Sequence, residues 1–317
     1  MPKKTGIRAM PASANQIRRG IVFICILLLG FVFRVYLATG SYNVDLKWFI
    51  VASELFQKNI FQFYSHLPSY IYPPLWYFVC GLLGTIAQAI EGVSFEFVER
   101  VFLSFVDLAL LGGLLKLARR RGLSLLWTAA LFFLNPVSVI LTGHHGQFDA
   151  LPLLFVVWAI VVLENTKRTR STNQILAFIL LTGALLFKQS ILFQVFTVFL
   201  AFHKNRFVGI VLTIFSVFFL GLSFVPFLPD AMSVITSTAN QYAGIVGVYG
   251  VSYAATLFCG QCVFPVFGMP FWALFRNIFA AFTGLFALTL RHKDAARSCL
   301  IVTLFFRIVS VNIRQSM

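Results

Sequence analysis

Long apolar segments alternate with short polar connections along most of this chain. A straight membrane-spanning helix needs ~20 apolar residues, and several segments are shorter, so we expect tilted, re-entrant or half-length helices among them. The pattern predicts an all-α, polytopic membrane protein with about ten to twelve embedded segments. The apolar segments are residues 21–33, 71–90, 98–115, 123–142, 150–163, 174–187, 189–202, 207–225, 251–268, 271–290 and 298–313.

Composition strengthens this interpretation. Of the 317 residues, 59% are hydrophobic and only 11% are charged, whereas an ordinary soluble domain carries about 25% charged residues. A soluble fold of this length has too little interior for so much apolar surface, so the bilayer must solvate much of it. We therefore expect a multi-pass integral membrane protein whose single domain covers residues 1–317.

The net charge of +15 does not indicate a nucleic-acid-binding protein, because the basic residues form short clusters between apolar segments instead of one continuous basic face. Such clusters are typical of cytoplasmic loops and of contacts with anionic membrane lipids. We expect the basic tail 1–20 and the clusters at 116–121, 164–170, 203–206 and 291–297 to face the cytoplasm.

This orientation places four other regions on the non-cytoplasmic side: the loop 40–70, the turn 143–149, Lys188 and the loop 226–250. It also creates a conflict, since two full crossings between residues 70 and 116 would put the 116–121 cluster on the wrong side. Either one of those two segments does not cross the membrane, or the cluster breaks the charge rule.

The loop 40–70 is the least apolar long stretch, and its residues 46–59 have helical apolar spacing, which predicts an amphipathic helix at the membrane surface. Asp45 lies just before this helix. A carboxylate there is close to bilayer depth yet reachable by water, so it is a candidate general base that takes a proton from an acceptor hydroxyl. The alternatives are a solvated loop aspartate and an N-cap of the helix.

A second polar group interrupts the apolar pattern in the turn 143–149. Polar side chains at membrane depth are costly unless they line a cavity or meet water, so this turn is a candidate site for sugar or phosphate. The alternatives are a metal site and a plain hairpin turn in which the last residue caps the next helix. Adjacent histidines point to different faces of a helix, which argues against a shared metal ion. The residues concerned are His144, His145, Gln147 and Asp149.

Several charges lie inside apolar segments, where ionisable groups are functional candidates by default. Lys188 would lie at the outer end of a helical hairpin, where it either binds a phosphate or extends to the interface. Asp107 would lie in the middle of a helix, where a partner such as Arg34 or Lys188 is expected instead of direct chemistry. Arg307 lies near the C-terminus.

The motif YIYPPLWYF at 70–78 predicts a helix that begins near its tandem prolines, because proline is tolerated in the first helical turn. Its aromatic residues, Tyr72 among them, suit an interfacial belt, and such rings also stack on sugars.

Taken in order, an apolar first segment, an early aspartate, an amphipathic helix and then Y-P-P-L resemble the GT-C glycosyltransferases. The resemblance is strongest to the dolichyl-phosphate-glucose-dependent glucosyltransferases of N-glycan assembly and to their bacterial relatives, in which a turn of the type H-F-Q-Y-N follows an apolar segment. The Asn-Pro pair before that turn resembles the one found at this place in bacterial GT-C enzymes and GPI mannosyltransferases. The resemblance covers roughly residues 21–225, and the matching residues are Asp45, Tyr72-Pro73-Pro74-Leu75, Asn135-Pro136 and His145-Gly146-Gln147-Phe148-Asp149.

The resemblance implies transfer of a hexose, such as glucose or mannose, from a polyprenyl-phosphate donor to a lipid-linked glycan or protein acceptor, with inversion, on the non-cytoplasmic face. The membrane would be a bacterial inner membrane or the endoplasmic reticulum. Asp45 would be the base. His145, Gln147 and Asp149 would shape the donor or acceptor site, while Lys188, His144 or His145, and Arg307 would meet the phosphate.

A phosphate leaves as a stable anion, so a single carboxylate suffices, unlike in glycoside hydrolysis. Whether a divalent cation is needed stays open, because GT-C enzymes differ in this respect. Relatives usually continue through further spans, which makes a truncated C-terminus an expectation. Two other functions stay open: a transporter or lipid flippase, for which inverted repeats would be expected, and a non-catalytic, truncated relative.

Overall fold

The computed structural model describes residues 14–40, 44–67, 70, 72–167, 169–203, 205–228, 230–232 and 288. This part of the chain consists of helices joined by short turns, and it contains no strand. The predicted all-α class is thus confirmed for the described residues. The apolar segments 251–268, 271–290 and 298–313, together with Arg307, lie outside them, apart from residue 288.

The α-helices follow the predicted apolar segments closely. In chain order they are α1 (Ala14–Ala38), α2 (Val44–Lys58), α3 (Phe63–His66), α4 (Pro74–Ala89), α5 (Phe95–Arg120), α6 (Leu125–Phe133), α7 (Pro136–Gly143), α8 (Ala150–Leu163), α9 (Arg170–Phe187), α10 (Leu192–Phe202) and α11 (Arg206–Ser223). Short 3₁₀ turns are found at Ile60–Gln62, Gln189–Ile191 and Val225–Phe227.

Four of the described helices are long and apolar enough to cross a membrane: Asn15–Ala38, Phe95–Arg120, Arg170–Phe187 and Arg206–Phe227. The pair α6 and α7 would add a fifth span, bent by 50°. The apolar helices α4 and α8 and the stretch Gln189–Phe202 are shorter. By length and composition the chain is therefore compatible with a multi-pass membrane protein.

The segment 123–142, which the pattern gives as one apolar segment, is divided into two helices at Asn135. Proline at position 136 has no N–H to donate to the preceding turn, and the Asn135 side chain caps the new helix by accepting from the Val137 N–H at 2.9 Å. The carbonyl freed at Phe133 accepts a 2.7 Å hydrogen bond from Arg34. A broken helix is tolerated in an apolar setting when neighbouring side chains satisfy its backbone in this way.

Arg34 also forms the buried ion pair that its charge requires. Its Nε lies 2.9 Å from a carboxylate oxygen of Asp107, and both side chains are almost wholly buried. The same oxygen accepts a 2.8 Å hydrogen bond from Thr142, and Arg34 donates to Ser138 at 2.8 Å. The expectation that Asp107 has a partner such as Arg34 is confirmed, and the pair joins α1, α5 and α7.

The basic connections gather at one end of the bundle. Arg121, after α5, lies 2.8 Å from Glu164, after α8. Gln174, near the start of α9, lies 3.3 Å from the His203 ring after α10. The clusters at 116–121, 164–170 and 203–206 therefore share an end, as one cytoplasmic side requires. The cluster at 291–297 lies outside the described residues.

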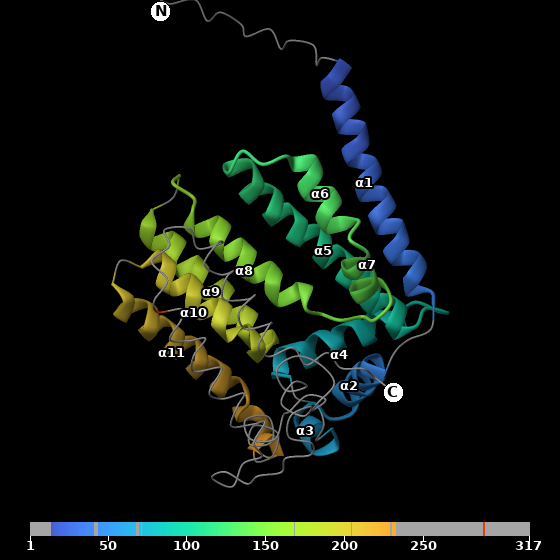
Figure 1. Ribbon diagram of the computed structural model, residues 1–317. Helices are drawn as coiled ribbons and strands as arrows, with labels where there is room; N and C mark the ends of the chain where they lie inside the picture. The colour runs from blue at the N-terminus through green and yellow to red at the C-terminus, as the bar shows by residue number, and fades with distance from the viewer. Residues whose placement is uncertain are drawn as a thin grey trace, which may run out of the picture.

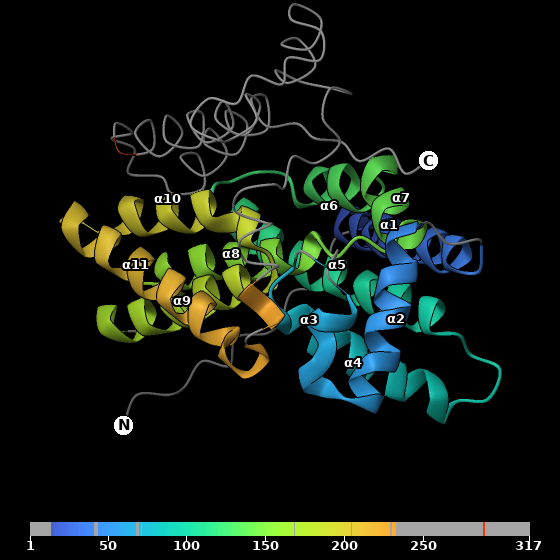
Figure 2. The same cartoon turned by 90° about the horizontal axis from the view of Figure 1, so that it is seen from below.

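At the other end, α2, α3 and α4 form a separate group across the ends of the longer helices (Figure 1). Seen from below, this group lies beside α5, to the right of the centre of the view. Helices α9, α10 and α11 lie at the left of the same view (Figure 2). Helix α4 has 16 residues and is not among the candidate spans. Of the two segments between 70 and 116, only α5 is long and apolar enough to be a candidate span.

Candidate functional site

The turn between α7 and α8 is held by its own backbone. The N–H groups of His144 and His145 both donate to the Ile140 carbonyl at 3.0 Å, and the Gln147 N–H donates to Leu141 at 3.0 Å. Gly146 adopts a φ of +63°, a conformation that glycine reaches without steric cost. The turn thus places its polar side chains at the end of the bundle away from the basic connections.

Asp149 and Lys188 form an ion pair across this end, between the start of α8 and the end of α9. Asp149 occupies the N-cap position of α8, but its side chain makes no capping hydrogen bond. The Lys188 side chain is 17% exposed and that of Asp149 35%. The capping alternative for Asp149 is therefore wrong, since its carboxylate faces a cation instead.

Aromatic rings complete the surroundings of Lys188. Its Nζ lies 5.6 Å from the centre of the Tyr72 ring and 5.2 Å from that of Phe148. A cation near an aromatic face is stabilised by the ring quadrupole. The structure thus brings together three candidate site residues that are far apart in the sequence: Tyr72, Asp149 and Lys188.

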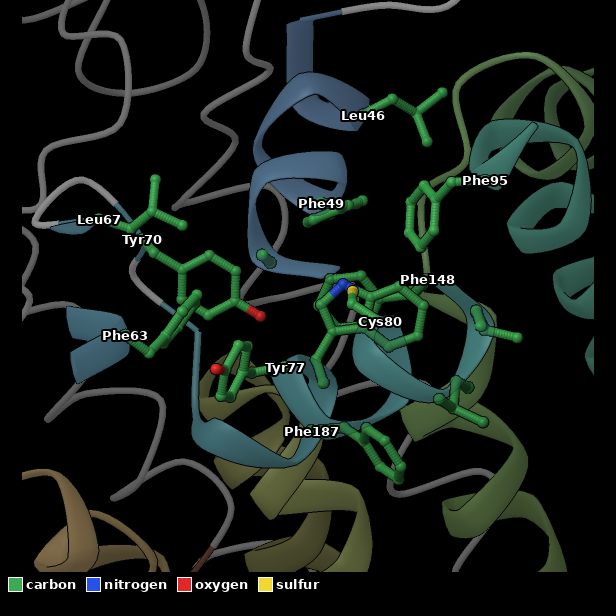
Figure 3. Close-up of a cluster of buried hydrophobic side chains, with 14 of the residues drawn as sticks. Leu46, Phe49, Phe63, Leu67, Tyr70, Tyr77, Cys80, Phe95, Phe148 and Phe187 are labelled. Carbon is green, nitrogen blue, oxygen red and sulfur yellow. The ribbon is translucent and has the colours of Figure 1, made fainter. Parts of the chain in front are cut away.

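Phe148 anchors the turn in the aromatic core at this end. Its ring stacks on Trp76 of α4 at 4.2 Å between centroids and meets Phe49 of α2 edge-on at 5.8 Å. The close-up shows Phe148 among side chains of α2 and α4 (Figure 3). Buried aromatic pairs of this kind contribute about 0.5–1.5 kcal/mol each beyond burial, so α2 and α4 hold the turn firmly.

Asp45 lies in the first turn of α2, because that helix begins at Val44. Its side chain is outside the described part of the structure. Its neighbour Leu46 is fully buried and lies against Gly146: a Cβ added at that glycine would come within 2.8 Å of Leu46 Cδ2. The helical turn that carries Asp45 is thus in contact with the polar turn.

The remaining predicted residues of the turn are half-buried. The rings of His144 and His145 lie 5.3 Å apart at 65°, and Gln147 lies between Gly146 and Phe148. Among the described residues no group of three histidines, cysteines or carboxylates could hold a metal ion. The sequence prediction placed these residues at the site, and the structure keeps all three in the same turn as Asp149.

Two buried charges beside the turn were missed by the sequence analysis. Glu99 and Arg100 are consecutive residues near the start of α5, and both are fully buried. One carboxylate oxygen of Glu99 lies 2.6 Å from where a Cβ of Gly146 would be, and within the described residues neither oxygen accepts a hydrogen bond. Their adjacency at the start of an apolar segment was the available signal, but it resembles an ordinary interfacial helix end.

The ring of Tyr70 belongs to the same aromatic core and packs edge-on against Phe63 of α3. Its ring meets Tyr72 edge-on at 5.4 Å, and burial raises the pKa of this phenol well above its ordinary value. Within the described residues its hydroxyl finds no hydrogen-bond partner. The phenol therefore stays neutral and serves packing at physiological pH.

No protein-family model matches this chain, and comparisons with curated proteins and with solved structures find no match.

Proposed function

We propose that this chain is an inverting glycosyltransferase with a GT-C-like fold, which moves a hexose from a polyprenyl-phosphate carrier to an acceptor on the non-cytoplasmic face. The observation that supports this most is the meeting of Lys188 with Asp149 and Tyr72 at the end of the bundle opposite the basic connections. The helical turn that carries Asp45 packs against the same polar turn.

Lys188 supplies the positive charge that a phosphate needs. Its side chain keeps some exposure, and its partner Asp149 keeps more. The phosphodiester of the incoming donor carries one negative charge, as the Asp149 carboxylate does, and the departing polyprenyl phosphate carries up to two. The departing group therefore competes for the ammonium and receives a charge-assisted hydrogen bond. His144 and His145, in the same turn, add hydrogen-bond donors for the departing group.

Asp45 acts as the base in this proposal. Its carboxylate takes the proton of the acceptor hydroxyl as that oxygen attacks the anomeric carbon. The bond from this carbon to the phosphate oxygen breaks, and the phosphate keeps the electron pair. Because polyprenyl phosphate is a stable anion stabilised by Lys188, no carboxylic acid has to protonate it.

The test uses purified protein with polyprenyl-phosphate carriers of glucose, mannose, galactose and arabinose, with lipid-linked glycans and peptides supplied as acceptors, and compares the wild type with Asp45→Asn. Release of polyprenyl phosphate from one carrier is expected for the wild type, with a loss of about 10²–10⁴-fold in the variant, the usual contribution of a general base. The matched control is Glu54→Gln, which alters an exposed carboxylate on the same helix and should keep full activity.

Two results would contradict the proposal. One is the absence of donor consumption by the wild type on all four carriers. The other is topological: cysteines introduced at positions 45 and 147 should be labelled from the same side of the membrane, and one at position 119 from the opposite side. Labelling of 45 and 147 from opposite sides would separate the base from the turn.

A further inference from the structure

Arg100 holds the end of helix α1 from a neighbouring helix. Its Nη1 lies within hydrogen-bond distance of three carbonyl oxygens, those of Leu37 (3.3 Å), Ala38 (3.1 Å) and Gly40 (3.2 Å). The last carbonyls of a helix have no partner within the helix, and a cation at that end is also favoured by the helix dipole. The guanidinium therefore ties the last turn of α1, as far as Gly40, to α5.

The chain that leaves α1 leads directly to the proposed base. Asp45 follows Gly40 by five residues, a reach of ~17 Å at most, and Leu46, the next residue, packs against Gly146. Glu99, next to Arg100 on α5, lies against Gly146 as well. One turn of α5 thus contacts two segments: the end of α1 through Arg100, and the turn 143–149 through Glu99.

We propose that Arg100 is a positioning residue, which sets the separation between the helical turn carrying Asp45 and the turn 143–149. This role rests on the proposed glycosyl transfer, since Asp45 is the base there. Arg100 is fully buried, so it acts on the reaction only through the chain segment that it holds. The planar guanidinium offers several donors in a fixed arrangement, which a lysine ammonium at the same place does not reproduce.

The experiment measures geometry and activity in the same variants. Nitroxide labels at positions 47 on α2 and 140 on α7, both exposed, report the distance between the two elements in a background that lacks the native cysteines. Arg100→Gln should broaden the distance distribution. It should also lower kcat by about 10–100-fold, as expected for a displaced catalytic group, with KM unchanged. Arg100→Lys should lie between the wild type and Arg100→Gln in both readouts.

Arg120→Gln is the matched control. Arg120 lies on the same helix and also donates to a backbone carbonyl, that of Val161 at 2.8 Å, but at the opposite end of the bundle. Its replacement should change neither the distance distribution nor kcat. A general weakening of α5 would instead affect both variants alike and would overturn the positioning role.

A distance distribution in Arg100→Gln that equals the wild type would also overturn the proposal. If that variant does not fold, Arg100→Lys carries the test: wild-type geometry together with wild-type kcat then contradicts the role. The distance measurement needs no substrate, so failure of the glycosyl-transfer proposal and failure of the positioning role remain distinguishable.

Discussion

Two ion pairs in this molecule have similar chemistry but very different surroundings. Arg34 and Asp107 are buried between helices, and serine, threonine and backbone partners satisfy their remaining groups. Lys188 and Asp149 lie at the end of the bundle, partly exposed and beside two aromatic rings. The first pair joins helices and has no access to a ligand. The second pair is partly exposed, as the proposed phosphate site requires.

The largest expected effect is on the buried pair. Asp107→Asn removes the countercharge of Arg34 and should lower the free energy of unfolding by about 3–5 kcal/mol, the usual result of breaking a buried pair. Thermal unfolding in detergent measures this. The double variant Arg34→Met with Asp107→Leu should recover much of the loss. If Asp107→Asn melts like the wild type, the buried pair does not stabilise the bundle.

Next in size is the effect of a methyl group at Gly146. Gly146→Ala places a Cβ 2.6 Å from the Glu99 carboxylate and 2.8 Å from Leu46, which adds about 1–3 kcal/mol of overpacking to the backbone cost of a positive φ. Gly122→Ala is the matched control, because Gly122 has a φ of +66° with nothing within 4 Å. It should lose only about 1–2 kcal/mol. Equal unfolding temperatures for the two variants would mean that the turn can move away from α5.

A smaller effect is expected for the ion pair of Lys188 and Asp149 in the candidate site. Lys188→Met should lower the free energy of unfolding by only about 1–2 kcal/mol, because partly exposed ion pairs and cation–π contacts contribute little. The control Arg121→Gln breaks the pair with Glu164, whose carboxylate keeps Arg120 as a second partner at 3.6 Å, so it should change the free energy of unfolding by less than about 0.5 kcal/mol. A loss in Lys188→Met as large as that in Asp107→Asn would remove the distinction between the two pairs.

The smallest effect concerns Tyr70, whose pKa burial raises. The neutral phenol stabilises the fold fully below about pH 10, the ordinary pKa of tyrosine, and this contribution is lost as the pH rises above it. Tyr70→Phe has no proton to lose, so it should melt within about 1 kcal/mol of the wild type at pH 8 and lose less stability at alkaline pH. Tyr36→Phe, at an exposed tyrosine, should follow the wild type throughout. Parallel pH curves for Tyr70→Phe and the wild type would contradict the burial of this phenol.

The apolar pattern predicted the described helices well because each helix end has a local signal. Pro74 at the start of α4 and Asn135-Pro136 at the start of α7 are such signals. The break within 123–142 was missed because the segment is apolar throughout, and its stability depends on Arg34 from another helix. The crosswise placement of α4 also depends on packing against α2, which no local pattern records.

The candidate site was predicted in part. Unusual polar residues at membrane depth were recognised at 143–149 and at Lys188, because burial of charge is costly wherever it occurs. That Lys188 pairs with Asp149 could not be read from the sequence, since the two are 39 positions apart and other partners were available. Glu99 and Arg100 escaped notice because their burial depends on α1, α2 and the turn meeting at α5.

The central claim is that the ammonium of Lys188 can leave Asp149 for a phosphate. Binding of polyprenyl phosphate to the purified protein tests it most directly, with Lys188→Met compared against Arg121→Gln. We expect Lys188→Met to bind at least about 10-fold more weakly than the wild type, since a charged hydrogen bond contributes about 1.5–3 kcal/mol, while Arg121→Gln binds like the wild type. Equal affinity of Lys188→Met and the wild type would contradict the account.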